Sequence, residues 1–282
     1  MNNSTPLTVA ISAPGMMGAG VGARLVANGV RVLVPLEGRS AASRARAGAG
    51  GMEDIAFDRI GEADMILSIV SPEFAEDFAT RVAAVAAGSG AVFADLNAIT
   101  PARAGRIAAL AEGAGLGFAD GGIIGPPPRD GGRDPVIYLS GPRAADVARL
   151  SGHGLRTAVL HGGVGEASAL KLSYAGITKG LSALGATMML AAARAGVEEQ
   201  LMAELGESQP HLATTFARSI PDMLPKSGRW VSEMHEIAEF IGTDHPEHGI
   251  YGAVAQLYER LFESRNAGGD EAETLMDLSG RR

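Results

Sequence analysis

Up to about residue 160, short runs of apolar and often β-branched residues alternate with longer Ala-rich stretches that have helical periodicity. Gly or Pro stands at nearly every junction between the two. This alternation is typical of βαβ units, in which helices cover both faces of a parallel sheet. The predicted strands are 7–12, 31–34, 65–70, 91–96, 117–119, 136–140 and a weaker 157–160, and the predicted helices between them are 17–28, 41–47, 73–87 and 101–113.

After His161 the strand-like runs stop and helical periodicity continues. The first helix is predicted over 166–195, which at 1.5 Å per residue is about 45 Å long, and Gly196 is expected to cap its C-terminus. Further helices are predicted at 197–205, 210–223, 229–241 and 246–264, and the charged, Gly-rich tail 266–282 is expected to fray. The pattern therefore predicts an α/β protein: a doubly wound sheet in a domain at 1–165, joined by a long helix to an all-α domain at 166–282.

Composition removes several classes of function. The 282 residues include no Cys, which excludes disulfides, thiolate metal sites and cysteine nucleophiles and suits a reducing compartment. Neither a basic, apolar leader at the N-terminus nor an apolar run long enough to cross a bilayer of ~30 Å is visible, so we expect a soluble, cytoplasmic protein without membrane partners. The net charge of −8 argues against nucleic acid, because phosphate binding needs basic surface.

A glycine-rich loop follows the first predicted strand and precedes the first predicted helix. Residues 13–20 read Ala-Pro-Gly-Met-Met-Gly-Ala-Gly, a G-x-G-x-x-G pattern in which Ala13 replaces the first Gly. Gly15 would let a pyrophosphate approach the backbone, Gly18 would allow close helix packing, and the helix N–H groups would face the anion. In a chain with 39 Gly the motif alone could be an ordinary turn, but its position favours a Rossmann-type dinucleotide-binding domain.

The end of the second predicted strand bears on the choice between NADP and NAD. An acidic residue there suits the ribose hydroxyl of NAD, whereas Arg with a neighbouring hydroxyl suits the 2′-phosphate of NADP. Glu37 favours the first cofactor; Arg39 and Ser40 favour the second. We expect NADP, with NAD possible, because Arg39 and Ser40 open the next helix, whose dipole also favours an anion; the alternative is a solvated turn with a surface Arg.

Several motifs, in the same order, resemble those of the β-hydroxyacid dehydrogenases, which include the 6-phosphogluconate and 3-hydroxyisobutyrate dehydrogenases, and of the related imine reductases. The resemblance covers residues 7 to about 195. It implies cofactor contacts from Gly15, Met16, Met17 and Gly18, from Val70, Ser71 and Pro72 at the end of the third predicted strand, and from Asn97 near the nicotinamide. Residues 120–125 occupy the place of the family's substrate loop, which implies substrate contacts from Gly121, Gly122 and Ile123, and residues 162–167 lead to Lys171 on the catalytic helix.

Two residues depart from the family pattern. Ile124 stands where the hydroxyacid enzymes carry a substrate-binding Ser, and Ala175 stands where they carry an Asn. These changes put the usual hydroxyacid substrates in doubt and, with the prolines at 126–128, favour a less polar substrate. Reduction of C=N bonds is therefore an alternative, as is an NADP(H)-binding sensor without turnover.

Lys171 is one of only three lysines in a chain with 21 arginines. It is the expected acid/base group, because a partly desolvated Lys in a cleft can exchange a proton during hydride transfer; the alternative is a solvated Lys in a salt bridge. Tyr174 and Thr178 lie on or beside the same face of the helix and are the expected substrate contacts, although packing or solvent exposure would explain them equally well.

Residues 225–236 combine two cations, the only Trp and a His. Family members dimerise through the helical domain, which implies a homodimer and lets Lys226, Arg229 or His235 contact an anionic substrate of the partner. A core stripe of Trp230 and Met234 explains the segment equally well. The six His residues have no metal-binding spacing, so no metal is expected.

Overall fold

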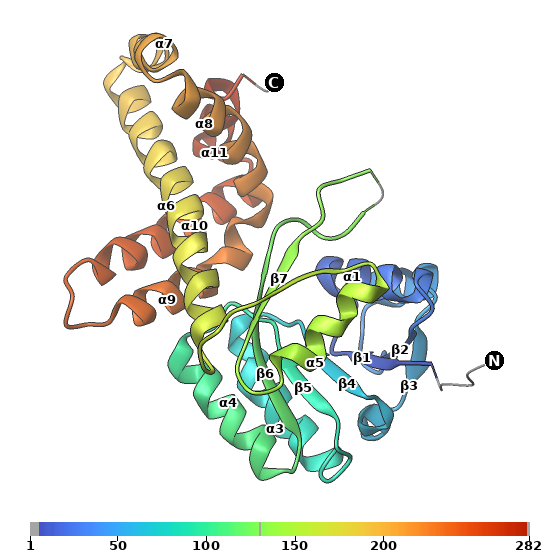
Figure 1. Cartoon of the computed structure of the whole chain (residues 1–282). Helices are drawn as coiled ribbons and strands as arrows, with labels where there is room; N and C mark the ends of the chain where they lie inside the picture. The colour runs from blue at the N-terminus through green and yellow to red at the C-terminus, as the bar shows by residue number, and fades with distance from the viewer. Residues whose placement is uncertain (1–5, 130, 281–282) are drawn as a thin grey trace. The chain divides into compact units, whose positions relative to one another are not determined.

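The computed structural model describes residues 6–129 and 131–280 (Figure 1). The chain divides into two compact units, one ending at Lys171 and the other beginning at Leu172. The first contains an eight-stranded sheet in the order β3-β2-β1-β4-β5-β6-β7-β8, in which all neighbours are parallel except β6 and β7. The strands are β1 Thr8–Ile11, β2 Arg31–Pro35, β3 Glu53–Ile55, β4 Met65–Ser68, β5 Val92–Asp95, β6 Gly117–Ile124, β7 Val136–Ser140 and β8 Arg156–Val159.

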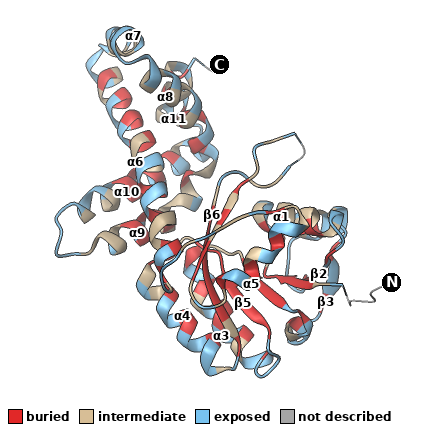
Figure 2. Ribbon diagram, viewed as in Figure 1, coloured by how far each residue is buried: buried red, intermediate tan, exposed pale blue. Residues whose placement is uncertain are grey.

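Helices cover both faces of this sheet, because the strands are apolar on both sides and need two covers. The α-helices of the first unit are α1 Met16–Ala27, α2 Ala41–Ala49, α3 Ala75–Val85, α4 Pro101–Gly113 and α5 Ala144–Ala148, and three 3₁₀ turns are η1 Phe57–Glu62, η2 Pro72–Phe74 and η3 Arg149–His153. One core cluster includes Leu25 of α1 and Val147 of α5, and the other includes Phe78 of α3 and Ile107 of α4. Figure 2 shows the buried strands between them. The predicted doubly wound sheet is confirmed.

Up to residue 280, six helices follow: α6 Glu166–Ala195, α7 Glu198–Ser208, α8 Pro210–Met223, α9 Ser227–Ile241, α10 His248–Ala267 and α11 Asp270–Leu278, with a 3₁₀ turn η4 Leu224–Lys226. The long helix α6 begins within the first unit and continues into the second, with the bounds expected from the sequence. Across the described ranges, no helix is long and apolar enough to cross a membrane.

Three elements correct the sequence prediction. The short strand β3 was missed, because Glu53 and Asp54 at an exposed sheet edge carry no apolar signal. The strand predicted at 117–119 continues to Ile124, so the segment expected to form a loop lies extended between β5 and β7. The tail expected to fray contains α11, which buries Ala272 and Leu275, three residues apart on one face.

Candidate active site

The strand order reverses between β1 and β4, and ligands of open α/β sheets bind outside the carboxyl ends of the strands at such a point. The glycine-rich loop follows β1 there. A β-carbon on Gly18 would overlap the carbonyl oxygen of Ala13, so only Gly lets α1 start this close to the strand. A β-carbon on Gly15 would meet no atom within 4 Å. The two glycines therefore differ: Gly18 is required by the fold, whereas Gly15 leaves open space in front of the helix.

The first turn of α1 suits an anion. Its N-cap, Gly15, offers no side-chain hydrogen bond, and no acidic residue lies in the first turn. The first N–H groups of a helix carry partial positive charge and have no partner within the helix. Met16 is 55% exposed and Met17 is half-buried, so the side chains of both predicted cofactor contacts are at least partly accessible in this first turn.

Two arginines bind the backbone of the same loop. Arg39 Nη2 donates to the carbonyl oxygen of Ser12 at 3.1 Å, and Arg46 Nε donates to that of Pro14 at 2.9 Å. Arg46 also donates to Ser43 Oγ at 3.0 Å, and Ser40 Oγ caps α2 by accepting the Ser43 N–H. The structure thus brings Arg39 and Arg46 to the glycine-rich loop, with Ser43 bound to Arg46 and Ser40 bound to Ser43. This grouping of two cations with two hydroxyls is the donor set expected for a phosphate.

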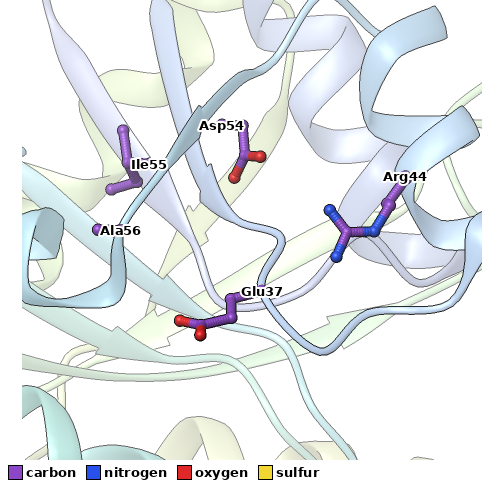
Figure 3. A pocket seen from close by; sticks show the side chains of 5 residues that line it. All are labelled: Glu37, Arg44, Asp54, Ile55 and Ala56. Atoms are coloured by element: carbon purple, nitrogen blue, oxygen red, sulfur yellow. The ribbon is translucent and has the colours of Figure 1, made fainter.

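Glu37 lies in a shallow, open hollow with Arg44, Asp54, Ile55 and Ala56 (Figure 3). Arg44 reaches the hollow from α2, and the other residues come from the ends of β2 and β3. Glu37 and Arg44 therefore line the same hollow, whereas the arginines that bind the glycine-rich loop are Arg39 and Arg46.

A buried polar network holds the ends of β4 and β5. The Asn97 side chain accepts the Val70 N–H at 2.7 Å and donates to Ser68 Oγ and to Asp95 Oδ2, each at 2.8 Å. Asn97 is only 3% exposed, so these bonds fix the turn that leads to Ser71 and the buried Pro72. Burial raises the pKa of Asp95 to about 7, against the lowering effect of its hydrogen bonds from Asn97 and Ser68, while nearby Asp120 raises it further.

Strand β6 contains the predicted substrate contacts Gly121, Gly122 and Ile123, followed by Ile124. Because side chains alternate along a strand, these residues lie on its two faces in turn. Gly121 and Ile123 face the core on the side of α1, where Ile123 is 5% exposed and a β-carbon on Gly121 would overlap the Leu96 side chain. Gly122 lies on the other face, against α6: a β-carbon there would stand 2.6 Å from Cβ of Lys171. Ile124 shares the face of Gly122 and is half-buried.

Lys171 is half-buried in the second turn of α6, at the end of the first unit. Tyr174 follows three residues later and is 46% exposed. Thr178 is exposed, and its hydroxyl donates to the Tyr174 carbonyl oxygen at 2.9 Å. Ala175, in the place of the family's Asn, is buried.

The segment 225–236 is used mainly for packing within the second unit. The Trp230 ring packs against the ring of the buried Tyr258 at an interplanar angle of 60°, with ring centroids 5.6 Å apart, and Met234 is fully buried. Lys179 Nζ lies 4.5 Å from the Trp230 ring centroid and pairs with the buried Glu233. These contacts favour the packing explanation for Trp230 and Met234. In the residues that the structure describes, no group of three His, Asp or Glu could hold a metal ion.

The sequence motifs predicted no individual role for several residues that hold the site together. They are Ser12, whose Oγ accepts the Ile69 N–H at 2.7 Å, and Arg46, Ser68, Asp95, Asp120, Ser140 and Ser168. A usable signal was present for Ser12, Ser68, Asp95 and Ser140, because each is a polar residue at the end of an otherwise apolar strand.

Comparison with known proteins agrees with this geometry. A domain of unknown function, DUF1932, matches residues 192–261. The sequence matches no curated protein. A conserved protein of unknown function, described as structurally similar to 3-hydroxyacid dehydrogenases, is 26% identical over 93% of this chain and 99% of its own, with a TM-score of 0.70.

Two enzymes show the same fold at lower identity. The 3-hydroxyisobutyrate dehydrogenase of Mycobacterium tuberculosis, solved with L-serine, is 20% identical over 97% of this chain and 99% of its own, with a TM-score of 0.71. An imine reductase of Streptomyces aurantiacus is 20% identical over 96% and 99%, with a TM-score of 0.55. Structural relatives bind NADP(H). The chain therefore has the fold of the NAD(P)-dependent β-hydroxyacid dehydrogenases and imine reductases.

Proposed function

We propose that this protein is an NADP(H)-dependent oxidoreductase in which Lys171 transfers the proton. The observation that carries the proposal is the open space at Gly15, which faces the start of α1 and is bordered by a loop that Arg39 and Arg46 bind. Because the helix start and both guanidinium groups favour anions, a dinucleotide with an additional phosphate suits this place best.

The cofactor would be held by residues of the first unit. Gly15, Met16, Met17 and Gly18 would border the pyrophosphate, and Arg39 and Ser40, with Ser43 and Arg46, would bind the 2′-phosphate. Val70, Ser71 and Pro72 would lie along the nicotinamide side, in a turn that Asn97 holds rigid. When bound, NADP(H) supplies or accepts the hydride.

Lys171 supplies what the cofactor lacks, a group that gives or takes a proton. It is half-buried, and the first carbons of its side chain pack against Gly122, so the base of the side chain is held by strand β6. As an ammonium it would donate to the atom that becomes a hydroxyl or amine, and as an amine it would accept that proton in the reverse direction. Tyr174 and Thr178, one and two turns later, are the proposed substrate contacts.

Ile124 bears on the substrate class. It shares the face of Gly122 and stands where the hydroxyacid enzymes carry Ser. An apolar side chain there removes a hydrogen-bond donor, which favours a less polar ketone or imine over a hydroxyacid. Reduction of C=N bonds is therefore the second candidate, and relatives of this fold include an imine reductase.

A panel assay separates these possibilities. Purified protein is incubated with NADPH and a small ketone or a cyclic imine, or with NADP and a hydroxyacid. The NADPH concentration is followed by absorbance. Turnover of an imine alone would select the second candidate. If NADPH binds but no member of the panel changes the NADPH concentration, the protein is an NADP(H)-binding sensor without turnover and the proposal of an enzyme is wrong.

The proposed assembly is a cytoplasmic homodimer formed through the helical unit. Ile177, Leu184 and Met188 of α6 are 71%, 60% and 53% exposed and recur at helical spacing, so they form an apolar stripe that a second copy would cover. Lys226, Arg229 and His235 remain the candidates for contacts with a partner's substrate. Sedimentation of the wild type and of Leu184→Glu tests the dimer: the variant should sediment as a monomer.

A further inference from the structure

Asp120 connects the sheet to the start of α6. It is fully buried in β6, and its two carboxyl oxygens accept four hydrogen bonds. Oδ2 accepts from Ser140 Oγ at 2.9 Å, from the Gly165 N–H at 2.9 Å and from the Ser168 N–H at 3.1 Å, and Oδ1 accepts from Ser168 Oγ at 2.6 Å. The side chain thus binds a neighbouring strand and two backbone groups at the beginning of the helix.

Ser140 of β7 adds a second connection. Its Oγ accepts the Ala167 N–H at 3.0 Å while donating to Asp120. The first N–H groups of a helix have no acceptor within the helix, so the Asp120 and Ser140 side chains supply acceptors that these groups would otherwise lack. Two strands therefore fix the N–H groups of Gly165, Ala167 and Ser168, and with them the rotation of α6 about its axis.

Gly122 makes the third contact, on the same face of β6 as Asp120 because side chains alternate along a strand. Its missing β-carbon would stand 2.6 Å from Cβ of Lys171 and 3.2 Å from the Ala167 carbonyl oxygen. The strand thus lies directly along the first two turns of the helix. Lys171 is three residues after Ser168 and therefore on the adjacent part of the helix surface.

We propose that Asp120, Ser140 and Gly122 are positioning residues that set the place of Lys171 relative to the sheet. The catalytic meaning of this inference rests on the proposed function of Lys171. The positioning itself can be measured without turnover.

The chain has only three lysines, Lys171, Lys179 and Lys226, so ¹³C-methylation of lysines gives few NMR signals and Lys171→Arg assigns the one of interest. The variants are Asp120→Ala, Ser140→Ala and Gly122→Ala. We expect the Lys171 signal to move in all three, and the signals of Lys179 and Lys226 to stay. Hydrogen exchange at Gly165, Ala167 and Ser168 should become at least ~10-fold faster in the first two variants.

Ser227→Ala is the matched control, because Ser227 is also fully buried and donates to a backbone carbonyl, but in the second unit. It should leave the Lys171 signal in place. Asp120→Asn, which can keep an acceptor at the position of Oδ2, should restore the signal toward that of the wild type. If Asp120→Ala does not fold, Ser140→Ala and Gly122→Ala carry the test.

An unchanged Lys171 signal in folded Ser140→Ala and Gly122→Ala would overturn the inference. On an identified substrate, Ser140→Ala should lower kcat and leave KM for NADPH unchanged. A moved Lys171 signal with unaltered kcat would instead show that the positioning is real and that the proposed role of Lys171 is wrong.

Discussion

Gly18 packs directly on Ala13: a β-carbon at Gly18 would overlap the Ala13 carbonyl oxygen and stand 3.3 Å from the Ile11 side chain. Gly18→Ala should therefore lower the free energy of unfolding by ~1–3 kcal/mol, the usual cost of overpacking, because the start of α1 must move. Chemical denaturation measures this loss. An unchanged midpoint would mean that the loop is less tightly packed than the structure indicates.

Gly15→Ala is the matched test of cofactor binding. Gly15 has extended backbone angles (φ −62°, ψ −177°) that Ala adopts easily, and a β-carbon there meets no atom within 4 Å. The free energy of unfolding should stay the same or rise slightly. Affinity for NADPH should fall at least ~10-fold, because the methyl group occupies space reserved for the pyrophosphate. Fluorescence titration measures the affinity, and wild-type affinity in this variant would place the cofactor elsewhere.

Arg39 and Arg46 should determine the preference for NADPH over NADH. Hydrogen bonds to charged groups contribute about 1.5–3 kcal/mol, so Arg39→Ala should weaken NADPH binding by ~10- to 100-fold and change NADH binding little. Arg59→Ala is the control, since Arg59 is exposed and pairs with Glu62 on η1. Equal losses for both cofactors would show that Arg39 shapes the loop and does not read the phosphate.

The buried Asp95 should make stability depend on pH. Its pKa is raised from 3.8 to about 7 by burial, so between these values the unfolded chain has released a proton that the folded protein keeps. The free energy of unfolding should fall as pH rises from about 4 to about 7, by at most ~4 kcal/mol, and this contribution should not change further above that range.

Asp95→Asn isolates this effect. The difference in unfolding free energy between the wild type and the variant, measured by urea titration at several pH values, should change across the same window. A difference that is constant with pH would show that Asp95 is ionised throughout it.

Lys179 should be a structural residue, in contrast to Lys171. Its ammonium pairs with the buried Glu233 and lies over Trp230, and the Tyr258 hydroxyl donates to its carbonyl oxygen at 2.7 Å. Lys179→Met should cost ~3–5 kcal/mol of stability, because a buried carboxylate would lose its cation. Lys226→Met, at a half-buried position, should cost far less. Both variants, where folded, should bind NADPH as the wild type does.

The sequence was sufficient for the parts of the fold that depend on periodicity and punctuation. Alternating strands and helices predicted the sheet, and uninterrupted helical spacing predicted α6 to the residue. It failed at β3 and at the second half of β6, where polar residues and glycines carry no strand signal and only pairing with neighbouring strands makes them extended. It also failed at α11, whose two buried apolar residues are too few to stand out among charges.

The candidate site divides in the same way. Gly15, Gly18 and Lys171 belong to local motifs and could be named from sequence. The hydrogen bonds of Arg46 and Asp120 could not be predicted, because their partners Pro14 and Gly165 lie 32 and 45 residues away along the chain. Ile123 and Ile124 are consecutive in the chain. Only the register of β6 shows that Ile123 faces the core, whereas Ile124 lies on the same face of the strand as Gly122.

The most direct test of the central claim is the turnover of Lys171→Ala on a substrate identified in the panel assay, with NADPH affinity measured on the same preparation. Removing a positioned acid/base group typically costs 10²- to 10⁴-fold, so kcat should fall by at least ~10²-fold, while the dissociation constant of NADPH should stay within about twofold. Wild-type turnover by the folded variant would contradict the assignment of the proton transfer to Lys171.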